Sequence, residues 1–146
     1  MIQPVLGVMN FRFQPYLNLI NIENNRVALS CFRVSAHRLE VETGKWHKPV
    51  AVPFNERKCR TCLNCLEDEF HSLLECPLYH ELRKTYIKPY YWNRLNMPKC
   101  IELMKTENKM DIRNVSMFIM KSFEIRKKQH FILTSMPLTL SFCTYM

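Results

Sequence analysis

Four residues in the middle of the chain have the spacing of a metal site, and this limits how the region can fold. Cys59 and Cys62 form a C-x2-C pair, and H-x4-C follows with His71 and Cys76. Zinc in structural sites is bound by four thiolate or imidazole ligands in a tetrahedron. A tight turn directs both thiolates of a C-x2-C pair at one ion, and a short helix that ends near Cys76 supplies the other ligands. Because four protein ligands leave no open coordination position, the expected site is structural and not catalytic.

The other cysteines leave one position of the ligand set open. Cys65 forms a second C-x2-C pair with Cys62, so Cys65 is an alternative ligand in place of Cys59. A competing interpretation is that all these cysteines are reduced thiols that pack as small hydrophobic residues. That interpretation suits the three cysteines that stand alone in the sequence: Cys31, Cys100 and Cys143. It suits the clustered ones poorly.

The cysteines also predict a compartment. The chain has 146 residues and seven cysteines, an odd number. Its first residues lack the charged and apolar regions of a secretory signal, because Pro4 and Arg12 interrupt the apolar residues. We therefore expect a reducing, intracellular compartment, nuclear or cytoplasmic, and no secretion. Such a compartment favours metal binding over a disulfide framework.

The basic composition predicts an anionic partner, since the formal net charge is +8. Nucleic acid is the usual partner of such a chain, and an acidic membrane surface is second. Arg57, Lys58 and Arg60 flank the first cysteine, where they can neutralise phosphates. Lys84 and Trp92 complete the expected nucleic-acid-binding set, although a tryptophan in a small domain often belongs to the core. Further aromatic residues would stack on unpaired bases if they are exposed: Trp46, Phe54, Tyr90 and Tyr91.

Helical patterns dominate the rest of the chain. Apolar residues recur at helical spacing over 16–35 and 111–128, and shorter helices are expected after Pro77 and Pro98. Over 37–46 apolar and charged residues alternate, which is typical of a short half-exposed strand or an extended turn. Two glycines in all argue against a barrel rich in turns. The sequence therefore predicts a mainly α, small zinc-stabilised helical domain with a short β-hairpin at the C-x2-C turn.

Three parts are expected along the chain. A loose lead-in covers 1–15, and the helical domain covers 16–128 with the zinc knuckle at 57–79. An apolar tail without charges follows over 129–146. A spanning helix needs about 20 apolar residues, and Pro137 interrupts this shorter stretch, so we expect a disordered tail and no membrane span.

Two ordered blocks of the sequence resemble a known family. The first runs from Phe32 to Trp46 (FRVSAHRLEVETGKW), and the second runs from Cys59 through the ligand pattern to Tyr79. Together they resemble the region that follows the reverse transcriptase domain in polyproteins of LINE-type, non-LTR retrotransposons of animals. The resemblance implies that this region helps to hold template RNA or target DNA. It also implies a set of zinc ligands, with Cys65 as a spare thiol: Cys59, Cys62, His71 and Cys76.

The chain lacks the catalytic signatures of that family. It has no Tyr-x-Asp-Asp polymerase motif and no set of spaced acids for a metal-dependent endonuclease. Glu67, Asp68 and Glu69 are explained as the first turn of a helix rather than as catalytic acids. We therefore expect a non-catalytic fragment with no small-molecule substrate, whose partners are RNA or DNA and other domains of the polyprotein. Two alternatives stay open: a helical protein-interaction module that zinc only stabilises, and a non-functional relic.

Overall fold

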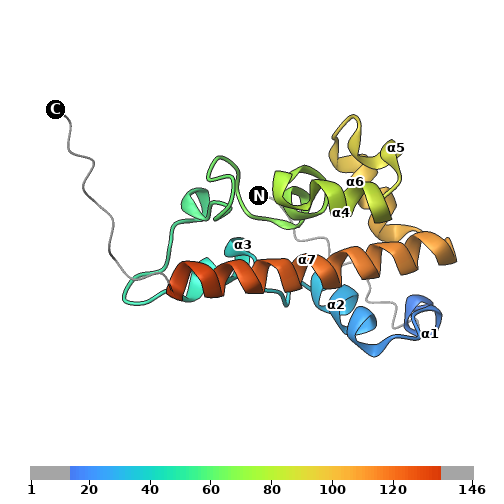
Figure 1. Ribbon diagram of the computed structural model, residues 1–146, viewed down its shortest axis with the longest axis horizontal. Coiled ribbons are helices and arrows are strands. Elements are labelled where there is room, and N and C mark those ends of the chain that lie inside the picture. Colours follow the sequence, from blue (N-terminus) through green and yellow to red (C-terminus); the bar gives the residue numbers. More distant parts are fainter. Residues whose placement is uncertain (1–13, 136–146) are drawn as a thin grey trace, which may run out of the picture.

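The computed structural model describes residues 14–135, and helices account for most of them (Figure 1). The α-helices are α1 (Tyr16–Leu19), α2 (Glu23–Arg33), α3 (Glu40–Thr43), α4 (His80–Tyr86), α5 (Pro89–Trp92), α6 (Met97–Lys105) and α7 (Lys109–Ser135). Shorter helical turns cover Gly44–Trp46, Phe54–Glu56, His71–Glu75 and Pro77–Tyr79. The prediction of a mainly α fold is confirmed. Within the described residues there is no strand, and the only β-pairing is an isolated antiparallel bridge between Lys58 and Leu66.

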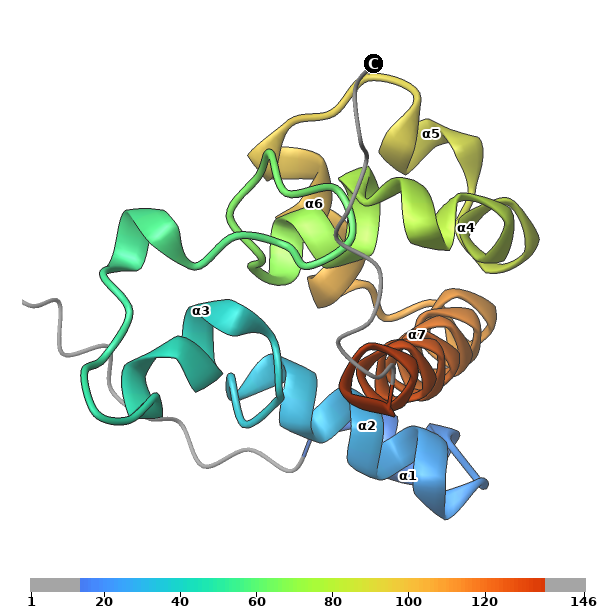
Figure 2. The ribbon, with the colours of Figure 1, turned by 60° about the vertical axis from the view of Figure 1, so that its left-hand side comes forward.

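Helix α7 forms the centre of the fold. In both ribbon views α1 and α2 lie on one side of α7, and α4, α5 and α6 lie on the other (Figures 1 and 2). Phe118 and Ile119 of α7 are almost fully buried, as are Leu29 and Phe32 of α2. Burial of apolar side chains from both sides of α7 therefore supplies the main core.

Asparagine side chains define where the two longer C-terminal helices begin. Asn96 Oδ1 accepts a hydrogen bond from Lys99 N (2.9 Å) at the start of α6. Asn108 Oδ1 accepts from Met110 N (2.9 Å) and from Asp111 N (3.2 Å) at the start of α7. Each side chain satisfies amide groups that have no partner inside the helix.

Helix α7 extends past the predicted boundary at 129, because it continues through Ser135. The first residues of the expected disordered tail are therefore helical. The rest of that tail, 136–146, and most of the expected lead-in, 1–13, lie outside the described residues.

Two local predictions about secondary structure are wrong. The helix expected over 16–35 is interrupted at Ile20, which is extended and whose carbonyl oxygen accepts a hydrogen bond from Arg26 Nη1 (3.3 Å). Most of the strand or extended turn expected over 37–46 is helical, since α3 and the turn Gly44–Trp46 occupy 40–46. Leu39, Glu40 and Val41 are all buried. The alternation of apolar and charged residues there does not mark an exposed face, because Glu40 is a buried, paired carboxylate.

Candidate metal centre

A wide helical turn places His71 and Cys76 beside the C-x2-C pair. Asp68 begins this segment, because its Oδ1 accepts a hydrogen bond from His71 N (2.8 Å), and the turn His71–Glu75 is a π-helix. In an α-helix five residues advance about 500°, which would leave the two side chains about 140° apart. Here Cys76 N donates to His71 O (2.7 Å), so one turn closes in five residues. The π-turn is thus the structural reason for the H-x4-C spacing.

A buried arginine holds the end of that turn. Arg83 of α4 donates from Nε to Leu73 O (2.9 Å) and from Nη2 to Cys76 O (3.1 Å). Its side chain satisfies carbonyl groups that the end of a helix leaves without partners. Arg83 is only 2% exposed. It therefore fixes the backbone of Cys76, the last candidate ligand in the sequence.

The C-x2-C pair lies on a tight turn closed by backbone hydrogen bonds. Cys59 N donates to Cys65 O, and Leu63 N donates to Cys59 O, both at 2.9 Å. Leu63 has a φ of 59°, in the left-handed region that a leucine adopts only at a cost of about 1 kcal/mol. The turn points both cysteine side chains inward.

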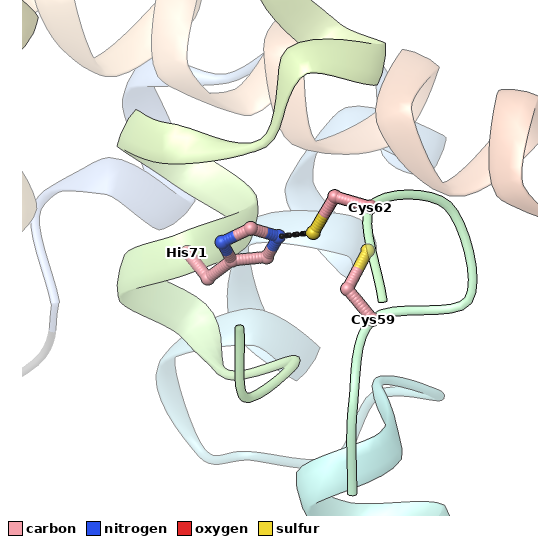
Figure 3. Close-up of side chains that lie close together, drawn as sticks. All are labelled: Cys59, Cys62 and His71. Carbon is pink, nitrogen blue, oxygen red and sulfur yellow. Dashed lines mark hydrogen bonds between the residues drawn. The ribbon is translucent and has the colours of Figure 1, made fainter. Parts of the chain in front are cut away.

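Three candidate ligands converge. The ligand atoms of Cys59, Cys62 and His71 all lie within 4.8 Å of one another. Figure 3 shows the two thiols on the turn facing the imidazole, with Cys62 Sγ 3.4 Å from His71 Nε2. Cys76 adjoins this trio through Cys59, since the two Sγ atoms are 3.9 Å apart. The structure thus groups three of the four residues that the spacing predicts, with Cys76 at the edge of the group.

Two ligand separations match edges of a tetrahedral zinc site. Zinc–sulfur bonds of about 2.3 Å and zinc–nitrogen bonds of about 2.0 Å give tetrahedron edges of about 3.8 Å between two sulfurs and about 3.6 Å between sulfur and nitrogen. The Cys59–Cys76 separation of 3.9 Å and the Cys62–His71 separation of 3.4 Å are close to these values. The four ligand atoms do not all lie within 4.8 Å of one another, so closure of a four-ligand site would require Cys76 to move towards the other ligands.

A second set shares the histidine. Ligand atoms of Cys65, His71 and Glu75 also lie within 4.8 Å of one another, and His71 Nδ1 is 3.2 Å from Glu75 Oε2. A carboxylate on the second ring nitrogen fixes the orientation of a metal-binding imidazole. Glu75 is not among the site residues predicted from the sequence. Its signal was the i, i+4 spacing from His71, which places two side chains on one helix face.

Hydrogen bonds and burial shift the pKa values of Cys59, Cys76 and His71. A hydrogen bond from Cys76 lowers the pKa of Cys59, although burial opposes this, and the same bond together with burial raises the pKa of Cys76. Burial lowers the pKa of His71, but hydrogen bonds to Cys59 and Glu75 outweigh it and raise that pKa to about 9. Metal binding therefore has to release protons from Cys76 and His71.

An ion-pair network connects the cysteine turn to α3 and α7. Arg126 of α7 donates to both carboxylate oxygens of Glu67, at 2.9 and 2.7 Å. Glu67 also accepts from Glu40 N (2.7 Å), and Glu40 accepts from Arg60 Nε (2.6 Å). Both carboxylates are buried, so their pairing compensates for lost hydration. The sequence analysis placed Glu67 in a helix start and gave Arg126 no role.

Most of the predicted nucleic-acid-binding residues already have partners. Arg57 donates to Val52 O and Val41 O, Arg60 pairs with Glu40, and Lys84 pairs with Glu81 at 2.9 Å. Trp92 is half-buried, and its Nε1 donates to Ile87 O (3.0 Å). Lys58 is exposed, and it makes no ion pair with any side chain that the structure describes. The predicted set is therefore not one free basic surface.

Comparisons with family models, with curated proteins and with solved structures gave no match to this chain. The resemblance to retrotransposon polyproteins therefore rests on the two sequence blocks alone. Within residues 14–135, no helix combines the length and the apolar character needed to cross a membrane.

Proposed function

We propose that this chain is a non-catalytic, zinc-stabilised module that binds RNA or DNA and is a fragment of a retrotransposon-type reverse transcriptase polyprotein. The observation that carries the proposal is the convergence of the ligand atoms of Cys59, Cys62 and His71 within 4.8 Å of one another, with Cys76 Sγ 3.9 Å from Cys59 Sγ. Zinc bound by these residues would hold the cysteine turn against the π-turn. Four protein ligands would leave no coordination position for a substrate.

The nucleic-acid part of the proposal is supported by charge. The chain has 21 Lys and Arg residues against 13 Asp and Glu residues. Arg57, Lys58 and Arg60 stand beside the first ligand, and Lys58 is the exposed member with no ion pair among the described side chains. Phosphate contacts of this kind supply sequence-independent affinity and make binding sensitive to salt.

Native mass spectrometry before and after chelation tests the zinc site. We expect one zinc ion per chain, lost on chelation together with part of the helical circular dichroism signal. Cys76→Ser should abolish the bound zinc. Cys65→Ser, the matched control, should retain it, because Cys65 lies outside the four-residue set. A chain without metal and with all seven thiols reactive would contradict the proposal and favour a non-functional relic.

Fluorescence anisotropy with labelled RNA and DNA at several salt concentrations tests nucleic-acid binding. Affinity should fall steeply between low and moderate salt, since each neutralised phosphate releases counterions. Zinc-loaded chain with no affinity for either nucleic acid at low salt would contradict the proposal.

One observation favours the alternative of a protein-interaction module. An open hollow of about 250 Å³ lies between α2 and α7. It is lined by Asn24, Ala28, Met120, Phe123, Glu124 and Lys127. A partner helix could contact its apolar floor, and such docking would depend little on salt. The salt titration thus separates the two functions.

A further inference from the structure

The segment that follows α3 exposes large apolar side chains. Trp46 is 79% exposed, Val50 is 76% exposed and Phe54 is 58% exposed. Figure 2 shows this segment projecting to one side of the helical body. Tryptophan is usually well buried in folded proteins, and clustered apolar exposure commonly marks an interaction site. Packing in the core therefore does not account for these apolar side chains.

The base of this loop is fixed. Val52 N donates to Gly44 O (2.9 Å), so the chain returns to the point from which it left α3. Arg57 donates to Val52 O and to Val41 O, both at 2.9 Å. Its side chain also covers Gly44, where an added Cβ would lie 2.7 Å from Arg57 Cγ. The exposed aromatic residues thus lie on a loop whose base is anchored by hydrogen bonds.

Arg57 also positions one of the aromatic rings. Its guanidinium carbon lies 5.7 Å from the centroid of the Phe54 ring, in the range of a cation–π contact. A ring held in this way loses less conformational freedom when it stacks on a ligand.

The loop and the turn after it are basic. Residues 44–60 contain a single acid, Glu56, and five basic residues: Lys45, Lys48, Arg57, Lys58 and Arg60. Lys48 and Lys58 are exposed, and neither forms an ion pair with a described side chain. Positive charge beside exposed aromatic rings is complementary to a ligand with phosphates and flat bases.

We propose that Trp46 and Phe54 stack on the bases of single-stranded nucleic acid, with Lys48 and Lys58 contacting its phosphates. The proposal rests on the proposed nucleic-acid-binding function and specifies its substrate class. Unpaired bases offer a free face to an aromatic ring, whereas the bases of a duplex are already stacked on one another. These side chains are therefore expected to bind single strands more tightly than a duplex.

The test compares a labelled oligothymidylate of about 20 nucleotides with the same strand annealed to oligoadenylate. Anisotropy is measured with the zinc-loaded full chain and with Trp46→Ala. Stacking on one base contributes enough that Trp46→Ala should weaken single-strand binding about tenfold, with about twofold or less for the duplex. Met110→Ala is the control, because Met110 is also a large exposed apolar side chain but lies on α7, and it should bind both probes like wild type.

Several outcomes overturn the proposal. If Lys58→Gln weakens binding while Trp46→Ala does not, nucleic-acid binding stands and the stacking role is wrong. Equal losses for single strand and duplex on Trp46→Ala overturn the preference for single strands. Wild-type chain that binds neither probe refutes this proposal and the proposed function together. Binding of a polyglutamate peptide that depends on Trp46, with no oligonucleotide binding, would identify an acidic protein partner instead.

Discussion

The helix pair α2–α7 and the segment 57–67 are held together by different forces. The pair buries large apolar side chains, among them Leu29, Phe32, Phe118 and Ile119. Over 57–67 only Cys59 and Glu67 are buried, and the only β-pairing is one isolated bridge. Apolar burial depends on water and is insensitive to chelators, whereas thiolate ligands and ion pairs depend on metal and on pH. One small domain thus contains a part that its own core stabilises and a part that, under the proposed zinc site, would need an ion.

Removing the metal should produce the largest difference in stability between the two regions. Binding of structural zinc supplies about 10 kcal/mol or more of apparent free energy in small zinc domains. Chelation, or Cys59→Ser, should therefore remove hydrogen-exchange protection over 57–76 while α2 and the first half of α7 stay protected. Mass spectrometry of the exchanged peptides measures both regions at once. Equal loss of protection in α7 would show that the two regions unfold as one unit.

Truncating the core should act on the other region. Phe118 is 1% exposed and contacts the Tyr79 ring edge-on, so Phe118→Ala should cost about 4 kcal/mol of unfolding free energy. Urea titration followed by circular dichroism gives the value. The cost should be similar with and without chelator. As a control on the same helix, Met110→Ala should cost less than about 0.5 kcal/mol, because Met110 is exposed.

Arg126→Met tests the link between the regions. It would leave the buried Glu67 carboxylate without its bidentate partner and should cost about 3 kcal/mol. The matched control is Arg113→Met, since Arg113 is an exposed arginine of α7 that makes one hydrogen bond, to Leu19 O. Its cost should be about 1 kcal/mol or less in the same urea titration. Equal stabilities of the two variants would show that the network contributes little.

Thiol alkylation is the prediction with the smallest expected effect. It compares a cysteine of the apolar core with the candidate ligand cysteines. Burial, followed by the charges of Asp68 and Glu69, raises the pKa of Cys100 to about 11. The thiol stays protonated below that pH, so at pH 8 its thiolate fraction is about a hundredfold lower than for an ordinary cysteine. Peptide mapping after iodoacetamide should find Cys100 slow with and without chelator, with a rate that rises as pH approaches 11.

The candidate ligand cysteines should behave differently in the same experiment. Cys59 has a lowered pKa and should react quickly once chelator removes the metal, but not before. Fast alkylation of Cys59 in the untreated chain would argue against a bound metal.

The parts of the structure that the sequence predicts are those set by neighbouring residues. Apolar periodicity indicates α7 and most of α2, and ligand spacing groups Cys59, Cys62 and His71. Prolines correctly separate the short helices, because a proline lacks the amide needed inside a helix. These signals operate within a window of about 11–18 residues of chain.

The parts that the sequence does not predict depend on distant partners. Glu40 is separated from Arg126 by 86 residues, and no local pattern shows that these two charges meet in the interior. The charged residue in an alternating stretch was therefore interpreted as solvent-facing. Arg83 is a second example, because its donors face the carbonyl groups of the preceding turn and no local pattern shows this.

The π-turn between His71 and Cys76 has a consequence for recognising such sites in other sequences. A five-residue spacing suits a π-turn, and a four-residue spacing places the same two ligands on one face of an ordinary α-helix. A single deletion within 72–75 would convert one arrangement into the other while both ligands still face the cysteine turn. Motif searches should therefore accept H-x3-C and H-x4-C as equivalent halves of one kind of site.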